Sequence, residues 1–162
     1  MLPSGSTDSF GMIKGHYRAV AATSERDVEA AQALRAVCFG VPARFDADVF
    51  DRHKQHILIR DLRTGRLVSC FRLEVLTGSM LEQSYAAQFY DLAKLSRYNE
   101  PMMELGRFCV RPGVNDPDVV RIAWAALTQY VEAHGIKLLL GCTSFAGTDA
   151  DRYGDVFALL HD

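Results

Sequence analysis

The sequence predicts an α/β fold in which helices flank a mixed β-sheet. Its 162 residues suit a single domain, because one hydrophobic core of ordinary size serves about 100 to 200 residues. Segments with strand and helix patterns alternate along the chain in the order β-α-β-β-α-β-α-β-α. This order combines one hairpin with strands separated by helices, which fits a mixed sheet better than a barrel or a helix bundle.

The composition excludes several classes of protein. With 18 basic and 20 acidic residues the formal net charge is −2, and 49% of the residues are apolar. This balance argues against a disordered chain and against a strongly basic nucleic-acid binder. No run approaches the roughly 20 apolar residues of a membrane span, and residues 1–14 lack the pattern of a signal peptide. The sequence therefore favours a cytoplasmic protein, with loose attachment to the inner face of a membrane left open.

The N-terminal residues differ in composition from the rest. Residues 1–15 are rich in Gly and Ser, which predicts a flexible N-terminal arm. A single domain is therefore expected over residues 16–162. Its first strand is predicted at residues 17–22.

A helix is predicted over residues 25–39. Ser24 is a good N-cap, acidic residues occupy the first turn, and Gly40 and Pro42 end the pattern. Apolar residues recur along this segment at helical spacing, and Arg35 falls beside the apolar stripe. Arg35 is therefore expected next to the core rather than in solvent.

A polar loop and a β-hairpin are predicted next. Residues 42–54 read as a loop. It carries three carboxylates within six positions, Asp46, Asp48 and Asp51. Strands are expected at residues 55–60 and 66–76, joined by a turn that contains Gly65. Arg72 places a charge within the apolar second strand.

The second half of the chain continues the alternation of helices and strands. The expected elements are a helix over 83–96, a strand over 102–110, a helix over 117–134, a strand over 136–142 and a helix over 152–160. Asp116 and Pro117 are typical of a helix start, and Gly135 is typical of a helix end. The strand over 136–142 is a continuous apolar run, so it is expected to be covered on both faces.

The cysteines and histidines do not predict a metal site. The cysteines are Cys38, Cys70, Cys109 and Cys142. Each lies alone in an apolar run, which favours buried thiols over a catalytic nucleophile, a zinc site or a disulfide framework. The five histidines show no metal-ligand spacing.

The strand over 102–110 holds the most informative residues. Glu104 and Arg107 are expensive to bury unless they are paired or used. Side chains alternate along a strand, so these two should point to opposite faces. Gly106 between them allows a β-bulge, which would bring both toward one cleft. A buried ion pair that only holds the sheet to the loop is the alternative.

An ordered set of residues resembles a known family. The set is Arg35 and Phe39, Asp48 and Asp51, Arg72, and Glu104, Arg107 and Phe108. In this order it resembles the acyl-homoserine-lactone (autoinducer) synthases, which are GNAT-like acyltransferases. Residues 89–92 (FYDL) and 140–149 (LGCTSFAGTD) are more similar to a sister family, the ornithine Nα-acyltransferases, which make lyso-ornithine lipid from 3-hydroxyacyl-acyl carrier protein. The resemblance spans residue 17 to the end and implies a GNAT-like sheet, whose last family strands this chain is expected to lack.

The resemblance implies that an amine attacks the thioester of an acylated phosphopantetheine arm, without a covalent enzyme intermediate. Glu104 and Arg107 would be catalytic, with Glu104 as the general base for the ammonium proton. The implied substrate-binding residues are Arg35, Phe39, Asp48, Asp51, Arg72, Phe108 and Val110. Among these, the two carboxylates would bind the amino acid, the arginines would organise the pocket, and backbone N–H groups near residues 108–110 would stabilise an oxyanion.

Departures from the relatives narrow the choice of acyl donor and of acceptor. Residues 111–121 contain one early Gly and two acids, which suits the pyrophosphate of coenzyme A poorly. The expected donor is therefore the acyl-phosphopantetheine of acyl carrier protein, with no tightly bound cofactor. The lactone synthases carry a Trp soon after the position of Phe39, but the single Trp here is Trp124. This argues against the lactone product, and the resemblance to the ornithine Nα-acyltransferases implies ornithine as the acceptor.

The implied partners are acyl carrier protein and an amino acid, and no nucleic acid. Because carrier proteins present an acidic helix, Arg111 and Arg121 are the expected docking residues, with Arg152 as a weaker third. Two alternatives stay open: an acyl-homoserine-lactone synthase that uses S-adenosylmethionine, and a non-catalytic domain that binds carrier protein or lipid.

Overall fold

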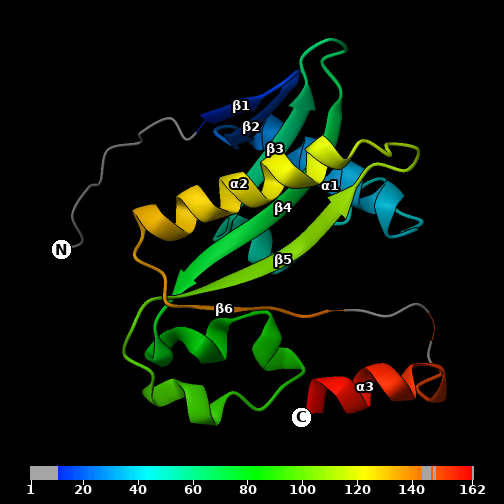
Figure 1. Ribbon diagram of the computed structural model, residues 1–162. Helices are drawn as coiled ribbons and strands as arrows, with labels where there is room; N and C mark the ends of the chain where they lie inside the picture. Colours follow the sequence, from blue (N-terminus) through cyan, green and yellow to red (C-terminus); the bar gives the residue numbers. More distant parts are fainter. Residues whose placement is uncertain (1–10, 144–146, 148, 162) are drawn as a thin grey trace.

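The computed structural model describes residues 11–143, 147 and 149–161. They form one six-stranded sheet in the order β1-β2-β3-β4-β5-β6, in which neighbours are antiparallel except for the parallel pair β5 and β6 (Figure 1). The strands are β1 (Gly11–Lys14), β2 (Tyr17–Ala21), β3 (Gln55–Asp61), β4 (Leu67–Leu76), β5 (Met102–Val110) and β6 (Leu138–Leu140). The predicted mixed α/β sheet is therefore confirmed.

Two long helices cover the two faces of the sheet, with α2 in front of it and α1 behind it in Figure 1. The helices are α1 (Glu25–Cys38), α2 (Pro117–Ala133) and α3 (Gly154–His161). On one face, α2 packs residues such as Ile122 against Ile57 and Phe71. On the other, α1 packs Leu34 against Leu58. The sheet is therefore buried on both faces along its centre.

The predicted helix starts are confirmed by their caps. The Ser24 hydroxyl accepts a hydrogen bond from the backbone N–H of Asp27 at 3.2 Å. Asp116 accepts one from the N–H of Asp118 at 2.9 Å, with Pro117 in the first turn. Each cap satisfies an N–H group that has no partner inside its helix.

The arm predicted over residues 1–15 is wrong for its last residues. Residues 11–14 form β1, which pairs with β2 through a tight turn at Gly15. Gly15 has φ of 58°, in the left-handed region that glycine adopts at low cost. The remainder of the predicted arm, residues 1–10, lies outside the described residues.

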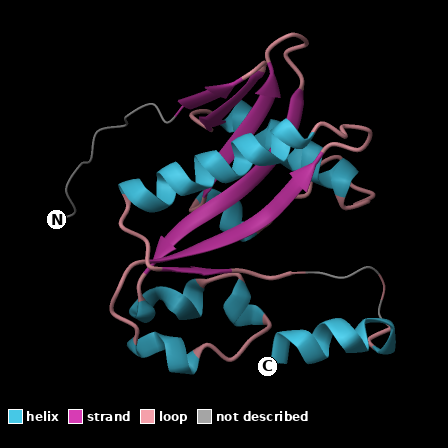
Figure 2. Ribbon diagram, viewed as in Figure 1, coloured by secondary structure: helices cyan, strands magenta, loops and turns pink. Residues whose placement is uncertain are grey.

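The helix predicted over residues 83–96 is also wrong, because short 3₁₀ turns occupy this segment, below β6 in Figure 2. The 3₁₀ elements of the chain are η1 (Val49–Arg52), η2 (Gly78–Gln83), η3 (Ala86–Gln88), η4 (Ala93–Arg97) and η5 (Asp151–Tyr153). The backbone N–H groups of Tyr85 and Ala86 bind the carboxylate of Glu104. Further along the segment, the side chain of Asp91 accepts from the backbone N–H of Ala93 at 2.9 Å, and such a local turn competes with a helical ladder.

The strand predicted over residues 136–142 is shorter and less covered than expected. β6 has three residues and lies at the edge of the sheet. Leu139 is 47% exposed, so the apolar run is not covered on both faces. Among the described residues, no helix is long and apolar enough to cross a membrane.

Candidate active site

The candidate site is a pocket of about 880 Å³ at the place where β5 and β6 separate. The two strands pair only from Met102 with Leu138 to Glu104 with Leu140, and then diverge (Figure 1). A Cβ atom at Gly141 would overlap the carbonyl oxygen of Leu105, so glycine is needed where the chains part. The strands therefore meet at one end of the pocket and form its walls beyond it.

The β-bulge predicted near Gly106 is confirmed. Between the pairs Cys70 with Cys109 and Arg72 with Gly106, β5 has one residue more than β4. The extra residue reverses the alternation of side chains, and both Glu104 and Arg107 line the pocket. The positive φ falls on Arg107, at 54°, rather than on the glycine.

The pocket has a polar end and an apolar wall. The polar end consists of Lys54, Arg72, Tyr85, Glu104 and Arg107. The apolar wall includes Phe39, Phe108, Trp124, Leu139 and Leu140. The rings of Phe108 and Trp124 stack with centroids 6.3 Å apart. The pocket can therefore accept a ligand with one charged end and one apolar end.

Glu104 is buried at the polar end and is held by three donors. The ammonium group of Lys54 donates to Oε2 of Glu104. The backbone N–H of Tyr85 donates to the same oxygen at 3.1 Å, and that of Ala86 donates to Oε1 at 2.7 Å. A carboxylate has about four acceptor positions. One position on Oε1 therefore remains for a further donor.

Three arginines and three aspartates form a compact arginine–aspartate cluster behind this end of the pocket. Its members are Arg35, Arg72, Arg107, Asp46, Asp48 and Asp51. Asp51 is the centre of the cluster, because its carboxylate accepts from Arg35 at 2.7 and 2.9 Å and from Arg72 at 2.6 Å. Asp48 accepts from Arg72 at 2.7 and 2.9 Å. The formal charges of the cluster sum to zero.

The cluster controls the ionisation of its carboxyls. Burial raises the pKa of Asp51, but hydrogen bonds from Arg35 and Gln32 outweigh burial and hold the pKa well below its ordinary value. Burial and Arg72 act in the same opposing way on Asp48, whose pKa is also lowered. Both side chains are therefore carboxylates throughout the neutral range.

A pH dependence of stability is expected from these pKa values. Below the ordinary Asp pKa of about 4, Asp51 binds a proton in the unfolded chain but stays ionised in the folded protein, because its pKa there is lowered. The free energy of unfolding is therefore expected to fall as the pH drops from about 5 toward 2. Urea unfolding at several pH values measures this slope, and Asp51→Asn is expected to flatten it. Equal slopes in the two proteins would contradict the role given to Asp51.

The structure brings most of the predicted site residues together. Those that line the pocket are Phe39, Arg72, Glu104, Arg107 and Phe108. Arg35, Asp48 and Asp51 lie behind them in the cluster. Direct binding of an amino acid by Asp48 or Asp51 would require an arginine to give up its partner. Val110 lies at the end of β5, where its carbonyl accepts from Cys38 at 3.4 Å.

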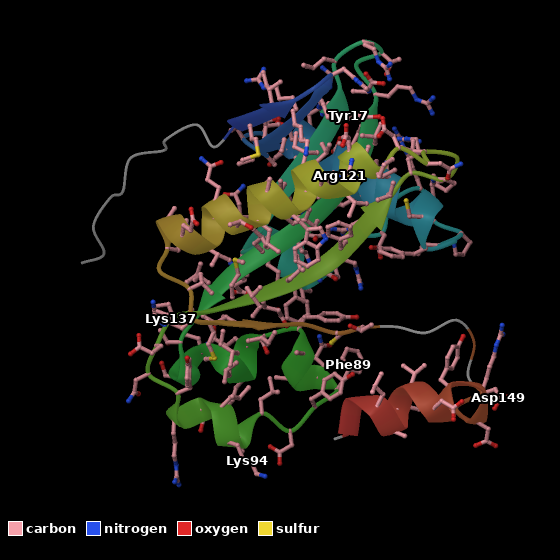
Figure 3. The ribbon with its side chains drawn as sticks, in the orientation of Figure 1. Tyr17, Phe89, Lys94, Arg121, Lys137 and Asp149 are labelled. Atoms are coloured by element: carbon pink, nitrogen blue, oxygen red, sulfur yellow. The ribbon has the colours of Figure 1, made fainter. Side chains whose placement is uncertain are left out.

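The predicted docking residues lie near the start of α2. The side chain of Arg121 is exposed and pairs with Asp118 at 2.8 Å; Figure 3 shows it near the start of α2, far from Lys137 beyond the other end. Nε of Arg111 donates to the carbonyl of Leu67 at 2.8 Å. Arg121 is therefore the more exposed of the two cations.

Lys54 and Tyr85 are site residues that the sequence analysis missed. Lys54 lies between η1 and β3, directly before the first residue of β3, and is only 6% exposed. A lone lysine next to an apolar strand was its only sign in the sequence. The hydroxyl of Tyr85 accepts from Arg107 at 3.3 Å.

The cysteines are distributed between the core and its margin. Cys70 and Cys109 are buried, and Cys38 and Cys142 are half-buried. Burial and the neighbouring Cys109 raise the pKa of the Cys38 thiol to about 12, so this thiol is a poor nucleophile at neutral pH. Over the described residues, no group of three or more His, Cys, Asp or Glu side chains is placed to hold a metal ion.

Comparison with known proteins agrees with this geometry. The family model of the acetyltransferase (GNAT) domain matches residues 32–125. The chain is 33% identical over 124 residues to an L-ornithine Nα-acyltransferase of Rhodobacter capsulatus, a match that covers 73% of this chain and 48% of the relative. The chain spans about half the length of the curated relatives it matches.

Solved structures of acyltransferases share the fold. The acyl-homoserine-lactone synthase LasI superposes with a TM-score of 0.59 at 19% identity, covering 79% of this chain and 72% of LasI. FeeM, an N-acyl amino acid synthase from uncultured soil microbes, gives a TM-score of 0.58 at 12% identity, covering 89% of this chain and 77% of FeeM. The family match, together with the splayed strands and their pocket, shows that the chain belongs to the GNAT acetyltransferase family.

Proposed function

We propose that the chain is an N-acyltransferase that moves a (3-hydroxy)acyl group from acyl carrier protein to the α-amino group of an amino acid, with ornithine as the acceptor. The observation that carries the proposal is a buried carboxylate, Glu104, with one acceptor position open at the polar end of a pocket that has an apolar wall. The similarity to L-ornithine Nα-acyltransferases supports the acceptor.

The proposed reaction needs a neutral amine next to a thioester. Glu104 takes one proton from the substrate ammonium, directly or through a water molecule. The amine nitrogen then bonds to the thioester carbon, and the carbon–sulfur bond breaks. The leaving sulfur takes the second proton that the nitrogen gives up, so the products are an amide and the free thiol of the phosphopantetheine arm. Backbone N–H groups near residues 108–110 stabilise the oxyanion that forms between these steps.

The apolar wall is the proposed place of the acyl chain. Phe108 and Trp124 offer it stacked aromatic surface, and Leu139 offers a further 47%-exposed side chain. An acylated amino acid is amphipathic, so the proposal includes a cytoplasmic reaction close to the inner face of a membrane.

Thiol release provides the direct test. The chain is incubated with 3-hydroxyacyl-acyl carrier protein and a panel of amines, and products are identified by mass spectrometry. Thiol release that depends on ornithine, with formation of its Nα-amide, is the expected result. No release with any amine would reject the proposal.

Two other functions have specific support. The fold similarity to LasI favours acyl-homoserine-lactone synthesis, which would make the product depend on S-adenosylmethionine. The ion pair between Glu104 and Lys54 favours a non-catalytic domain, which would bind carrier protein without turnover. Product analysis with and without S-adenosylmethionine, together with a carrier-binding measurement, separates the three.

Carrier binding is expected to depend on Arg121 and Arg111. Arg121→Glu and Arg111→Glu should weaken binding mainly through the association rate, because exposed charges act by long-range attraction. The affinity of the unchanged protein should also fall as salt rises. Surface plasmon resonance measures both effects, and Arg26→Glu, an exposed change at the start of α1, is the matched control. If the affinity does not depend on salt and neither substitution changes it, the carrier protein binds at another surface.

A further inference from the structure

Lys54 lies between two carboxylates at the polar end of the pocket. Its ammonium group donates to Glu104 and also lies 3.1 Å from Oε2 of Glu74. The Lys54 side chain is 2% exposed, and those of Glu104 and Glu74 are 2% and 16% exposed. The ring of Phe50 covers the ammonium group with its centroid at 5.3 Å. One buried cation thus serves two carboxylates.

The two glutamates lie opposite each other on neighbouring strands of the sheet. Glu74 on β4 and Glu104 on β5 are directly paired residues of the antiparallel ladder. Like charges at such a position repel and destabilise a sheet. Oε2 of Glu74 is buried and makes no hydrogen bond to any described residue, although Lys54 is within ion-pair distance. The hydrogen bond of Lys54 therefore belongs to Glu104, and Glu74 receives only the attraction of its charge.

We infer that Lys54 and Glu74 together set the basicity of Glu104, so that both are positioning residues for the base. The inference rests on the proposed function. An adjacent ammonium group and two backbone N–H donors favour the ionised form of Glu104, whereas the opposing carboxylate of Glu74 favours the protonated form. Lys54 holds Oε2 of Glu104 by a hydrogen bond, and Glu74 lies 3.1 Å from the same ammonium group.

The charge of this group also suits the acceptor. One ammonium against two carboxylates leaves a net charge of −1, in contrast to the neutral arginine–aspartate cluster behind it. The charged and titratable groups around Glu104 are Lys54, Arg72, Glu74, Tyr85, Arg107 and Cys142. Arg72 and Arg107 are already engaged with aspartates. The residual negative charge therefore attracts the ammonium form of an amine substrate.

The pH dependence of turnover tests the inference, because two substitutions should move it in opposite directions. Lys54→Met removes the cation, so Glu104 protonates at higher pH. The midpoint of the acidic limb of the kcat/KM profile should therefore move to higher pH by about one to three units. Glu74→Gln removes the opposing charge, so the midpoint of the same limb should move to lower pH by about one unit. Lys54→Arg keeps the charge and should restore a limb close to that of the unchanged protein.

The controls separate this inference from the proposed function. Lys137→Met changes an exposed lysine just before β6 and should leave the profile where it is. The Glu104 side-chain carboxyl can also be titrated by ¹³C NMR without any substrate, with Glu104→Gln to assign its resonance. The same opposite shifts are expected there, even if the chain does not turn over the chosen substrates. An unmoved titration in folded Lys54→Met would overturn the inference. If that variant does not fold, an unmoved titration in Glu74→Gln would do so.

Discussion

Glu104→Gln is expected to lower turnover by about 10²–10⁴-fold while the protein stays folded. Glutamine keeps the shape of the side chain, and its one amide oxygen can still accept from the N–H of Ala86 at 2.7 Å, whereas its NH2 group cannot replace the oxygen that accepts from Tyr85. It cannot take a proton from the substrate ammonium. Lys54 retains Glu74 at 3.1 Å as a counter-charge, so the lysine is not left without a partner. Initial rates of thiol release and a thermal melt are measured on the same preparation.

The thermal melt distinguishes a catalytic role of Glu104 from a purely structural one. A fall in rate with a small change in Tm supports a base, whereas a large fall in Tm with a matching loss of active protein supports a structural ion pair. Glu132→Gln, an exposed change on α2, is the control for the loss of one carboxylate. Unchanged turnover in Glu104→Gln would remove this residue from the mechanism.

Asp51→Ala is expected to destabilise the protein by about 3 to 5 kcal/mol. Arg35 and Arg72 are each 1% exposed and both donate to this carboxylate. Removal of Asp51 leaves two buried guanidinium groups with one anionic partner each, Asp46 and Asp48. For a domain of this size the Tm should fall by about 6 to 20 °C. Urea unfolding and calorimetry measure the two quantities.

The matched control for Asp51→Ala is Asp118→Ala. Asp118 forms an exposed ion pair with Arg121, and such pairs contribute about 0 to 1 kcal/mol. Asp118→Ala should therefore change the free energy of unfolding by about 1 kcal/mol or less. Equal losses in the two variants would show that burial of the cluster adds nothing to its contribution to stability.

Local chemistry predicted the elements that depend on neighbouring residues. The caps Ser24 and Asp116 set the starts of α1 and α2, and β5 spans the residues that were expected. The helix predicted over residues 83–96 was wrong, because the helical composition of this segment outweighed the turn signal of Asp91, whose side chain accepts from the backbone N–H of Ala93.

The candidate site was predicted in part. The sequence placed Glu104 and Arg107 on one strand and allowed the bulge that turns both into the pocket. It did not indicate that Glu104 would pair with Lys54. Lys54 is 50 positions away from Glu104 in the chain. The spacing of residues along a sequence carries no information about such a pairing.

By itself, the sequence determined the fold class, the alternation of strands and helices, and the residue types available for acyl transfer, because periodicity and capping are local properties of the chain. Only the tertiary structure decided which charges meet. It joined Asp51 to Arg35 and Arg72, and it placed Lys54 between Glu74 and Glu104. The physical reason is that a buried charge is stable only beside an opposite charge or donor, and packing of the whole sheet determines which partner is close enough.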